Sequence, residues 1–99
     1  MLKGYQKMFI RKIANDFNPA VIVGQHGLTD SLLKAIDEAL FVNEVIKIKF
    51  SDFKEKAMKK EIVEKITETL KCENAGIIGH TALLYKQREE NPKIVLPQK

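Results

Sequence analysis

The residues whose types and spacing best fit a binding site lie at one short turn. Gly24 and Gly27 enclose Gln25 and His26, and Thr29 follows as a good N-cap for a helix. Glycine allows another backbone to approach closely, and the first N–H groups of a helix are available donors at the positive end of its dipole. The turn therefore predicts a phosphate site, although two glycines at this spacing more often mark only a turn.

Basic residues near both ends of the chain are the second candidates. The net charge of +4 is concentrated in the two terminal segments. Lys3, Lys7 and Arg11 recur every four residues along a predicted helix, and Lys86 and Arg88 lie near the C-terminus. Exposed lysines on a helix are ordinarily a solvated face, so a basic patch is expected only if these ends join the glycine turn.

Residue types used in catalysis and metal binding are sparse. Cys72 is the one cysteine, so an internal disulfide is excluded, and with two histidines, His26 and His80, it gives too few ligands for a structural zinc site. No His or Asp lies near Cys72 in sequence to activate it. We therefore predict no catalytic residue, no metal and no cofactor.

The setting of the protein follows from what the sequence lacks. It shows no secretory signal and no apolar run long enough to cross a membrane, and its single cysteine fits a reducing compartment. We expect a cytoplasmic protein that does not bind membranes.

The elements that must position the turn form one domain over residues 1–99. Hydrophobic periodicity predicts helices and strands in the order 2–17, 20–23, 28–41, 45–50, 52–71, 75–78 and 81–86. Strands separated by helices make parallel crossovers, and the last two strands form a hairpin. The expected fold is an α+β two-layer sandwich, α-β-α-β-α-β-β, with a four-stranded mixed sheet and an extended tail over residues 88–99.

Packing expectations follow from the same periodicity, and a capping box of Asp52 and Glu55 is expected to start the third helix. In strand 45–50, one face is expected to stay uncovered by core, which leaves Val45, Lys47 and Lys49 facing solvent or a partner. The position of the first helix is left open. The predicted apolar stripes are Leu2, Tyr5, Phe9, Ile13 and Phe17 in the first helix, with Met8 and Ile10 beside them, and Met58, Ile62, Ile66 and Leu70 in the third.

In their order and spacing, several motifs make the chain resemble the YhbY family, the stand-alone bacterial and archaeal form of the CRM domain (chloroplast RNA splicing and ribosome maturation). The resemblance runs nearly end to end. The motifs that carry it are Leu2 and Gly4 with Gln6 and Lys7, residues 23–29 around the glycines, residues 36–40, residues 44–49, residues 78–81 leading into Leu84 and Tyr85, and residues 91–94.

The resemblance implies a fold similar to the C-terminal domain of bacterial translation initiation factor 3 and binding to RNA precursors of the large ribosomal subunit. It also implies that residues 24–27 are the RNA-contacting loop, analogous to the loop with which KH domains clamp a nucleic-acid backbone. Family members often carry a basic residue at the positions of Gln25 and Tyr5. This chain therefore has less positive charge where a phosphate is expected.

The leading hypothesis is a monomeric, non-enzymatic RNA-binding protein that acts in ribosome biogenesis on the pre-50S subunit. The alternative is a protein-interaction module for a ribosomal protein or assembly factor, which would use the strand face of Val45, Lys47 and Lys49. A small enzyme has no supporting residue spacing. The residues expected to contact RNA are Gly24, Gln25, His26, Gly27, Thr29, Lys3, Lys7, Arg11, Lys86 and Arg88.

Overall fold

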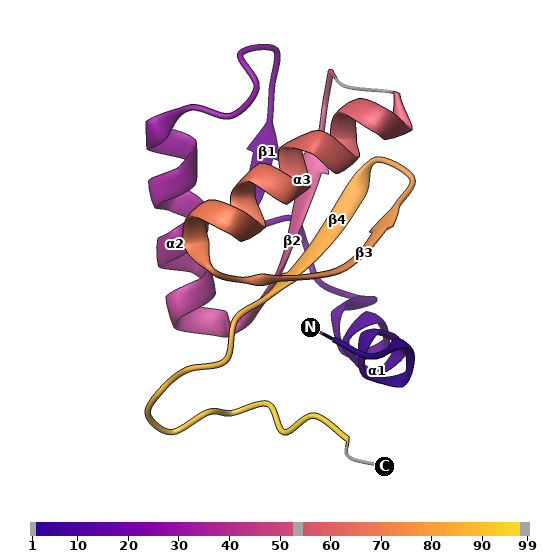
Figure 1. The fold of residues 1–99 in the computed structure, drawn as a ribbon, viewed down its shortest axis with the longest axis vertical. Helices are drawn as coiled ribbons and strands as arrows, with labels where there is room; N and C mark the ends of the chain where they lie inside the picture. The colour runs from indigo at the N-terminus through magenta and orange to yellow at the C-terminus, as the bar shows by residue number, and fades with distance from the viewer. Residues whose placement is uncertain (1, 53–54, 98–99) are drawn as a thin grey trace.

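The computed structural model describes residues 2–52 and 55–97, and it contains the expected order of helices and strands (Figure 1). Boundaries differ from the sequence expectation by a few residues at several helix and strand ends. The elements are α1 (Gly4–Ala14), β1 (Val21–Val23), α2 (Asp30–Asn43), β2 (Val45–Phe50), α3 (Lys56–Leu70), β3 (Glu73–Ile78) and β4 (Thr81–Tyr85).

The four strands form one mixed sheet in the order β1-β2-β4-β3. β1 pairs parallel to β2, with Val23 beside Phe50, and β4 pairs antiparallel to both β2 and β3. The predicted α+β class and four-stranded mixed sheet are therefore confirmed. Because β1 is an edge strand, the turn that follows it lies at one corner of the sheet.

Helices α2 and α3 cover one face of the sheet, as expected for the crossover helices (Figure 1). Helix α1, whose position the sequence left open, lies on the other face of the sheet. It covers only part of that face, and it packs there on Val45, Ala75, Leu83 and Tyr85. The larger core, between the sheet and α2 with α3, contains Val23, Ile36, Leu40, Ile46, Ile48, Phe50, Val63, Ile66, Ala82 and Leu84.

The buried side of α1 differs from the predicted stripe. Ile10 and Ala14 are fully buried against the sheet, whereas Phe17 lies beyond the helix and is 38% exposed. Met8, expected beside the stripe, is 60% exposed. Apolar residues occur on more than one side of this helix, so periodicity alone could not select the side that meets the sheet.

The start of α3 also differs from its prediction. The helix begins at Lys56, and its N-cap, Glu55, makes no side-chain capping hydrogen bond. The expected Asp52–Glu55 capping box is therefore wrong. Met58 is exposed, and the buried positions are Lys59, Val63 and Ile66, of which only Ile66 belongs to the predicted stripe.

A buried glutamate fixes the C-terminal segment. Glu44 is 1% exposed, and its carboxylate accepts hydrogen bonds from the backbone N–H groups of Arg88 (3.2 Å), Lys93 (2.5 Å) and Ile94 (3.2 Å). Ile94 and Leu96 then pack against the core beneath α1. Residues 86–97 contain no helix or strand, and the hydrogen bonds to Glu44 hold them against the domain. Residues 98 and 99 of the expected tail lie outside the described residues.

Candidate nucleic-acid interface

Residues 24–27, called the glycine turn below, form a tight connection at the end of β1. The N–H of Gly27 donates to the carbonyl of Gly24 at 3.0 Å, and Gly27 has φ 66°. This left-handed conformation favours glycine because a Cβ strains it. Gln25 and His26 are exposed at the tip. The turn thus presents backbone and two polar side chains to solvent.

The N-terminus of α2 follows the glycine turn directly. Thr29 is the N-cap, and its Oγ1 accepts the N–H of Leu32 at 3.1 Å. Asp30 adds a negative charge to the first turn. The start of a long helix carries a positive partial charge and N–H groups that intrahelical bonding leaves available. Backbone donors and dipole together can hold an anionic group beside the turn.

An acidic side chain limits the direction of approach. The N–H and Oγ of Ser51 both donate to the carbonyl of Val23, at 3.0 and 3.2 Å, so the end of β2 lies against the start of the turn. Asp52 Oδ2 lies 3.9 Å from the place where a Cβ on Gly24 would stand. A carboxylate repels phosphate at this distance. The favourable approach is therefore from the α2 side, towards Gly27.

Two lysines that the sequence reasoning did not assign to the RNA site belong to elements that adjoin the turn. Lys49 is exposed, and its Cα partner on β1 is Ile22, two residues before Gly24. Lys34 is exposed in the N-terminal half of α2, just after the N-cap Thr29. The parallel register of β1 on β2 is the signal that would have identified Lys49.

The basic row of the first helix lies at the other side of the sheet. Arg11 is exposed, but its guanidinium lies over β3, where a Cβ on Gly76 would be only 2.6 Å from Nη2. Lys7 lines a small hollow together with Glu73 of the same strand, and Lys3 is exposed. β3 is the edge strand opposite β1, so the structure does not bring these three cations to the glycine turn.

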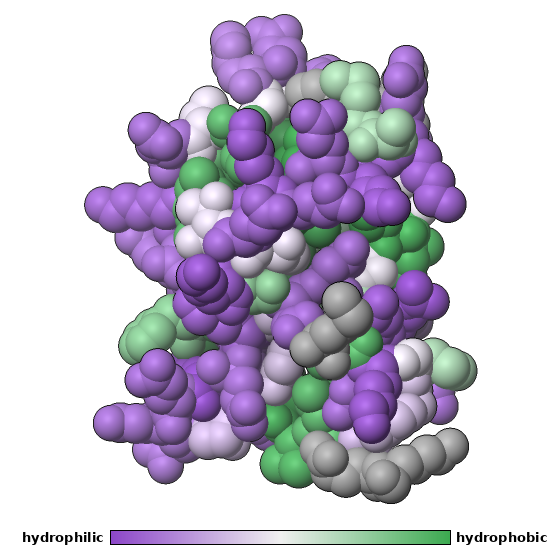
Figure 2. All heavy atoms as spheres, in the orientation of Figure 1, coloured by the Kyte–Doolittle hydropathy of each residue, from purple (hydrophilic) through white to green (hydrophobic). Residues whose placement is uncertain are grey.

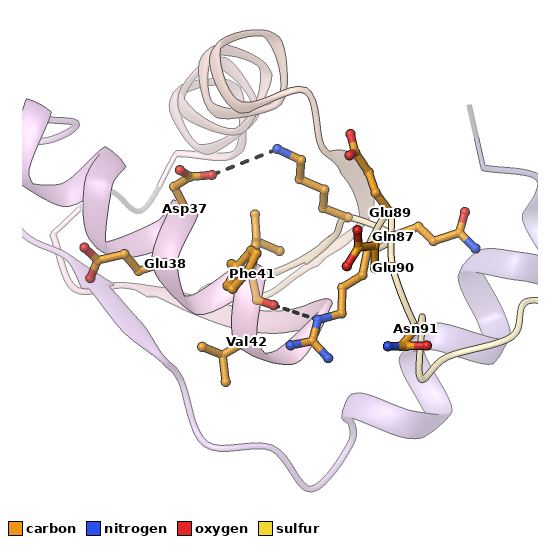
Figure 3. A pocket seen from close by; sticks show the side chains of 11 residues that line it. Asp37, Glu38, Phe41, Val42, Gln87, Glu89, Glu90 and Asn91 are labelled. Carbon is orange, nitrogen blue, oxygen red and sulfur yellow. Dashed lines mark hydrogen bonds and ion pairs between the residues drawn. The ribbon is translucent and has the colours of Figure 1, made fainter.

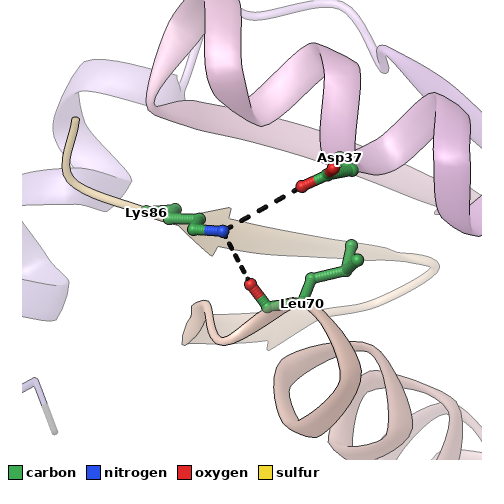
Figure 4. A network of polar contacts seen from close by, with 3 residues as sticks. All are labelled: Asp37, Leu70 and Lys86. Carbon is green, nitrogen blue, oxygen red and sulfur yellow. Dashed lines mark hydrogen bonds and ion pairs between the residues drawn. The ribbon is translucent and has the colours of Figure 1, made fainter. Parts of the chain in front are cut away.

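Lys86 contacts Asp37 and Arg88 contacts Phe41, both in the C-terminal half of α2 (Figures 3 and 4). The Nζ of Lys86 donates to the carbonyl of Leu70 at 2.9 Å and lies 4.0 Å from Asp37. The Nε of Arg88 donates to the carbonyl of Phe41 at 3.0 Å, and its guanidinium lies over that ring. With a rise of 1.5 Å per residue, the helix separates this end from Thr29 by roughly 18 Å.

The side chains of Cys72 and Lys59 are buried and contribute to the packing of the fold. Cys72 is buried, and burial raises the pKa of its thiol from 9.0 to about 11, so the reactive thiolate is scarce near neutral pH. The buried Lys59 Nζ donates to the carbonyl of Gly79 at 2.6 Å and lies 3.4 Å from His80 Nδ1. This contact holds the β3–β4 turn against α3. Sequence periodicity missed Lys59 because lysine is seldom buried.

Within residues 2–52 and 55–97, no three His, Cys, Asp or Glu side chains gather closely enough to hold a metal ion. Over that same part of the chain, none of the helices has the length and apolarity needed to cross a membrane.

Known proteins with similar sequences and folds point to one family. A family model described as the CRS1 / YhbY (CRM) domain matches residues 2–86. The Bacillus subtilis protein named "Probable RNA-binding protein YqeI" is 36% identical over 97 residues, which cover 98% of this chain and 100% of that protein. A Haemophilus influenzae protein named "RNA-binding protein" is 37% identical over 94 residues, 95% of this chain and 93% of the relative.

The fold of a solved structure is similar as well. The solution structure of a hypothetical Staphylococcus aureus protein, described as a candidate RNA-binding protein, aligns with a TM-score of 0.84 and 32% identity. The alignment covers 98% of this chain and 100% of that one.

Proposed function

Because this chain belongs to the CRS1/YhbY (CRM) domain family, we propose that it is a non-enzymatic RNA-binding protein that holds the RNA backbone at the glycine turn. The relatives named above are called RNA-binding proteins, which supports the class of ligand. The observation that carries the site is the left-handed Gly27 immediately before the N-terminus of α2. An exposed turn of this kind suits a phosphate.

The mode of binding follows from the groups at the turn. Backbone N–H groups contact phosphates of any sequence, so the turn positions an RNA strand without reading its bases. Lys34 and Lys49 supply positive charge on the adjoining elements, and the exposed Gln25 and His26 can donate hydrogen bonds to the RNA backbone. We expect recognition of RNA shape or of flexible single strands.

The five terminal cations of the predicted site keep a smaller role in this proposal. They lie on other elements and do not reach the glycine turn, so they act through long-range attraction that falls with ionic strength. They are Lys3 at the N-cap of α1, Lys7 and Arg11 on α1, and Lys86 and Arg88 after β4.

The proposed biological ligand is precursor RNA of the large ribosomal subunit, bound by a monomer in the cytoplasm. The resemblance of the chain to the YhbY family supports this target. Crosslinking in cells, followed by sequencing of the attached RNA, tests it. Enrichment of large-subunit precursors is the expected result, and enrichment of unrelated transcripts instead would refute this target while leaving the RNA site itself intact.

The structure removes part of the support for the alternative, a protein-interaction module. Its proposed face required Val45, Lys47 and Lys49 to be open. Val45 is 1% exposed beneath α1, and the Nζ of Lys47 donates to the carbonyl of Asn15 at 3.4 Å. Only Lys49 of the three is exposed, so this strand face is not proposed as the binding site.

Salt dependence of affinity tests the proposal. A fluorescent fragment of large-subunit ribosomal RNA is titrated with the protein at several salt concentrations. Each phosphate contact lowers the slope of log K against log salt by about 0.7 for a single strand. Two or three contacts at the turn predict a slope of roughly −1.4 to −2.1. An affinity that does not change with salt would contradict phosphate binding.

A further inference from the structure

A groove separate from the glycine turn lies between the C-terminal half of α2 and residues 86–91. It has a volume of about 820 Å³, and Figure 3 shows Phe41 projecting into it from the helix. Phe41 is 73% exposed and Val42 is 57% exposed. Figure 2 shows a small pale-green group at the lower left, among hydrophilic side chains. Two adjacent large apolar side chains are thus open to solvent inside a concave surface.

Acidic side chains border the groove on both walls. Asp37 and Glu38 lie on α2, and Glu89 and Glu90 lie on the facing segment (Figure 3). All four are exposed, in a chain whose net charge is +4. The groove, called the acidic groove below, therefore has a local charge opposite to that of the whole protein.

The two cations in the acidic groove make internal contacts. Lys86 contacts the carbonyl of Leu70 and the carboxylate of Asp37 (Figure 4). Arg88 donates to the carbonyl of Phe41, and its guanidinium centre lies 5.7 Å from the centre of that ring. Lys86 Nζ and Arg88 Nε are directed at these groups, whereas Glu89 and Glu90 are exposed.

The second wall of the groove is fixed in place. The carboxylate of Glu44 accepts the N–H groups of Arg88 and Lys93, on either side of residues 89–92, and the carbonyl of Glu44 accepts the N–H of Lys86 at 2.8 Å. A groove whose walls are already ordered loses little conformational entropy when a ligand enters.

From this geometry we propose that the acidic groove binds a basic segment of a partner protein, with an apolar side chain of the segment against Phe41 and Val42. Carboxylates on both walls attract flanking lysines or arginines and repel RNA, and the apolar floor favours a hydrophobic anchor. The proposal is independent of RNA binding at the glycine turn. It would let one small domain hold RNA at one end and a cationic protein segment at the other.

A synthetic peptide tests this proposal with the full-length protein. The probe is a short fluorescein-labelled peptide rich in lysine and arginine with one central leucine, and binding is followed by fluorescence anisotropy. The matched peptide has serine in place of leucine. We expect the leucine peptide to bind more tightly than the serine peptide, and amide shifts in NMR spectra to cluster at residues 37–42 and 86–91.

Variants locate the binding. Glu89→Gln with Glu90→Gln removes two negative charges. Each exposed ion pair with a basic residue of the peptide contributes little, so losing both pairs should weaken binding by roughly threefold to tenfold. The control, Glu64→Gln with Glu68→Gln, removes the same charge from exposed positions of α3 and should change affinity by less than about twofold.

A second pair of variants tests the apolar anchor. Phe41→Ser should weaken binding roughly tenfold or more, because the leucine of the peptide loses its main apolar contact. Met8→Ser, at another exposed apolar position, is its control. If Phe41→Ser lowers the melting temperature strongly, the double variant Glu89→Gln with Glu90→Gln tests the groove instead, because both glutamates are exposed.

Other outcomes would overturn the proposal. Absence of peptide binding, or equal losses in groove and control variants, would remove the groove as the site. Displacement of the peptide by the ribosomal RNA fragment, with shifts at the same residues, would assign the groove to RNA. Self-association abolished by Phe41→Ser would assign it to a second copy of this chain. Gly27→Asp should leave peptide affinity unchanged, which separates this test from that of the glycine turn.

Discussion

Gly27→Asp places a carboxylate and a Cβ at the point where the chain turns towards the N-terminus of α2. We expect RNA binding to fall at least about tenfold while the fold survives. For unit charges 4 Å apart at an effective dielectric constant near 20, repulsion is about 4 kcal/mol, and exposure and salt reduce that value. About 1.4 kcal/mol suffices for a tenfold loss.

The cost to stability should be small. Gly27 has φ 66°, where an ordinary residue loses about 1–2 kcal/mol, and aspartate tolerates this region better than most residues. The favourable interaction of a carboxylate with the helix N-terminus offsets about 0.3–1 kcal/mol of this cost. The net destabilisation of about 1 kcal/mol or less corresponds to a fall in melting temperature of roughly 4–8 °C at most.

Two matched variants make the assay decisive. Gly79→Asp adds the same charge at another left-handed glycine, with φ 59° and open space around its Cβ position. Gly27→Asn keeps the shape of aspartate without its charge. RNA affinity is measured by anisotropy, and folding by circular dichroism melts. Wild-type affinity in folded Gly27→Asp, or an equal loss in Gly79→Asp, would refute phosphate binding at the glycine turn. If Gly27→Asp does not fold, Gln25→Asp provides the same charge at an exposed position.

Three further predictions concern other parts of the chain. Glu44→Gln should destabilise the domain by about 2 kcal/mol, because its carboxylate accepts three backbone N–H groups, and hydrogen exchange of residues 88–94 should accelerate; unchanged exchange would contradict the anchoring role. Lys34→Glu with Lys49→Glu should flatten the salt slope of RNA binding by about 0.7 per lost contact, whereas Lys7→Glu, which removes only long-range attraction, should flatten the slope by less than the loss of one contact. Cys72→Ser should leave RNA binding unaltered. Because burial raises the pKa of the folded-state thiol from 9.0 to about 11, the free energy of unfolding of the wild type should fall as pH rises from 9 to 11. Urea unfolding should show no such thiol-dependent fall in the variant.

Local signals explain which features could be predicted from the sequence. The glycine turn, the Thr29 cap and strand β2 depend on residues within a few positions of one another, and each is where the sequence placed it. The order of helices and strands then determines the mixed sheet. The phosphate-binding role of the turn stays a prediction.

Features that depend on distant residues could not be predicted in this way. Glu44 is buried because the N–H groups of Lys93 and Ile94, about fifty positions away, reach its carboxylate. Lys59 is buried because the carbonyl of Gly79 lies above it. The cations at the two chain ends were expected to join the turn, but charge along a sequence carries no information on which edge of the sheet each helix will cover.

The most direct test of RNA binding at the glycine turn is an NMR titration of the isotopically labelled protein with the ribosomal RNA fragment. Amide shifts report the contact residue by residue without any substitution. RNA binding at the glycine turn should give the largest shifts at Gly24, Gly27, Thr29 and the first turn of α2, with small changes on α1 and at residues 86–91. Large shifts confined to α1 or to residues 86–91, with an unperturbed turn, would contradict it.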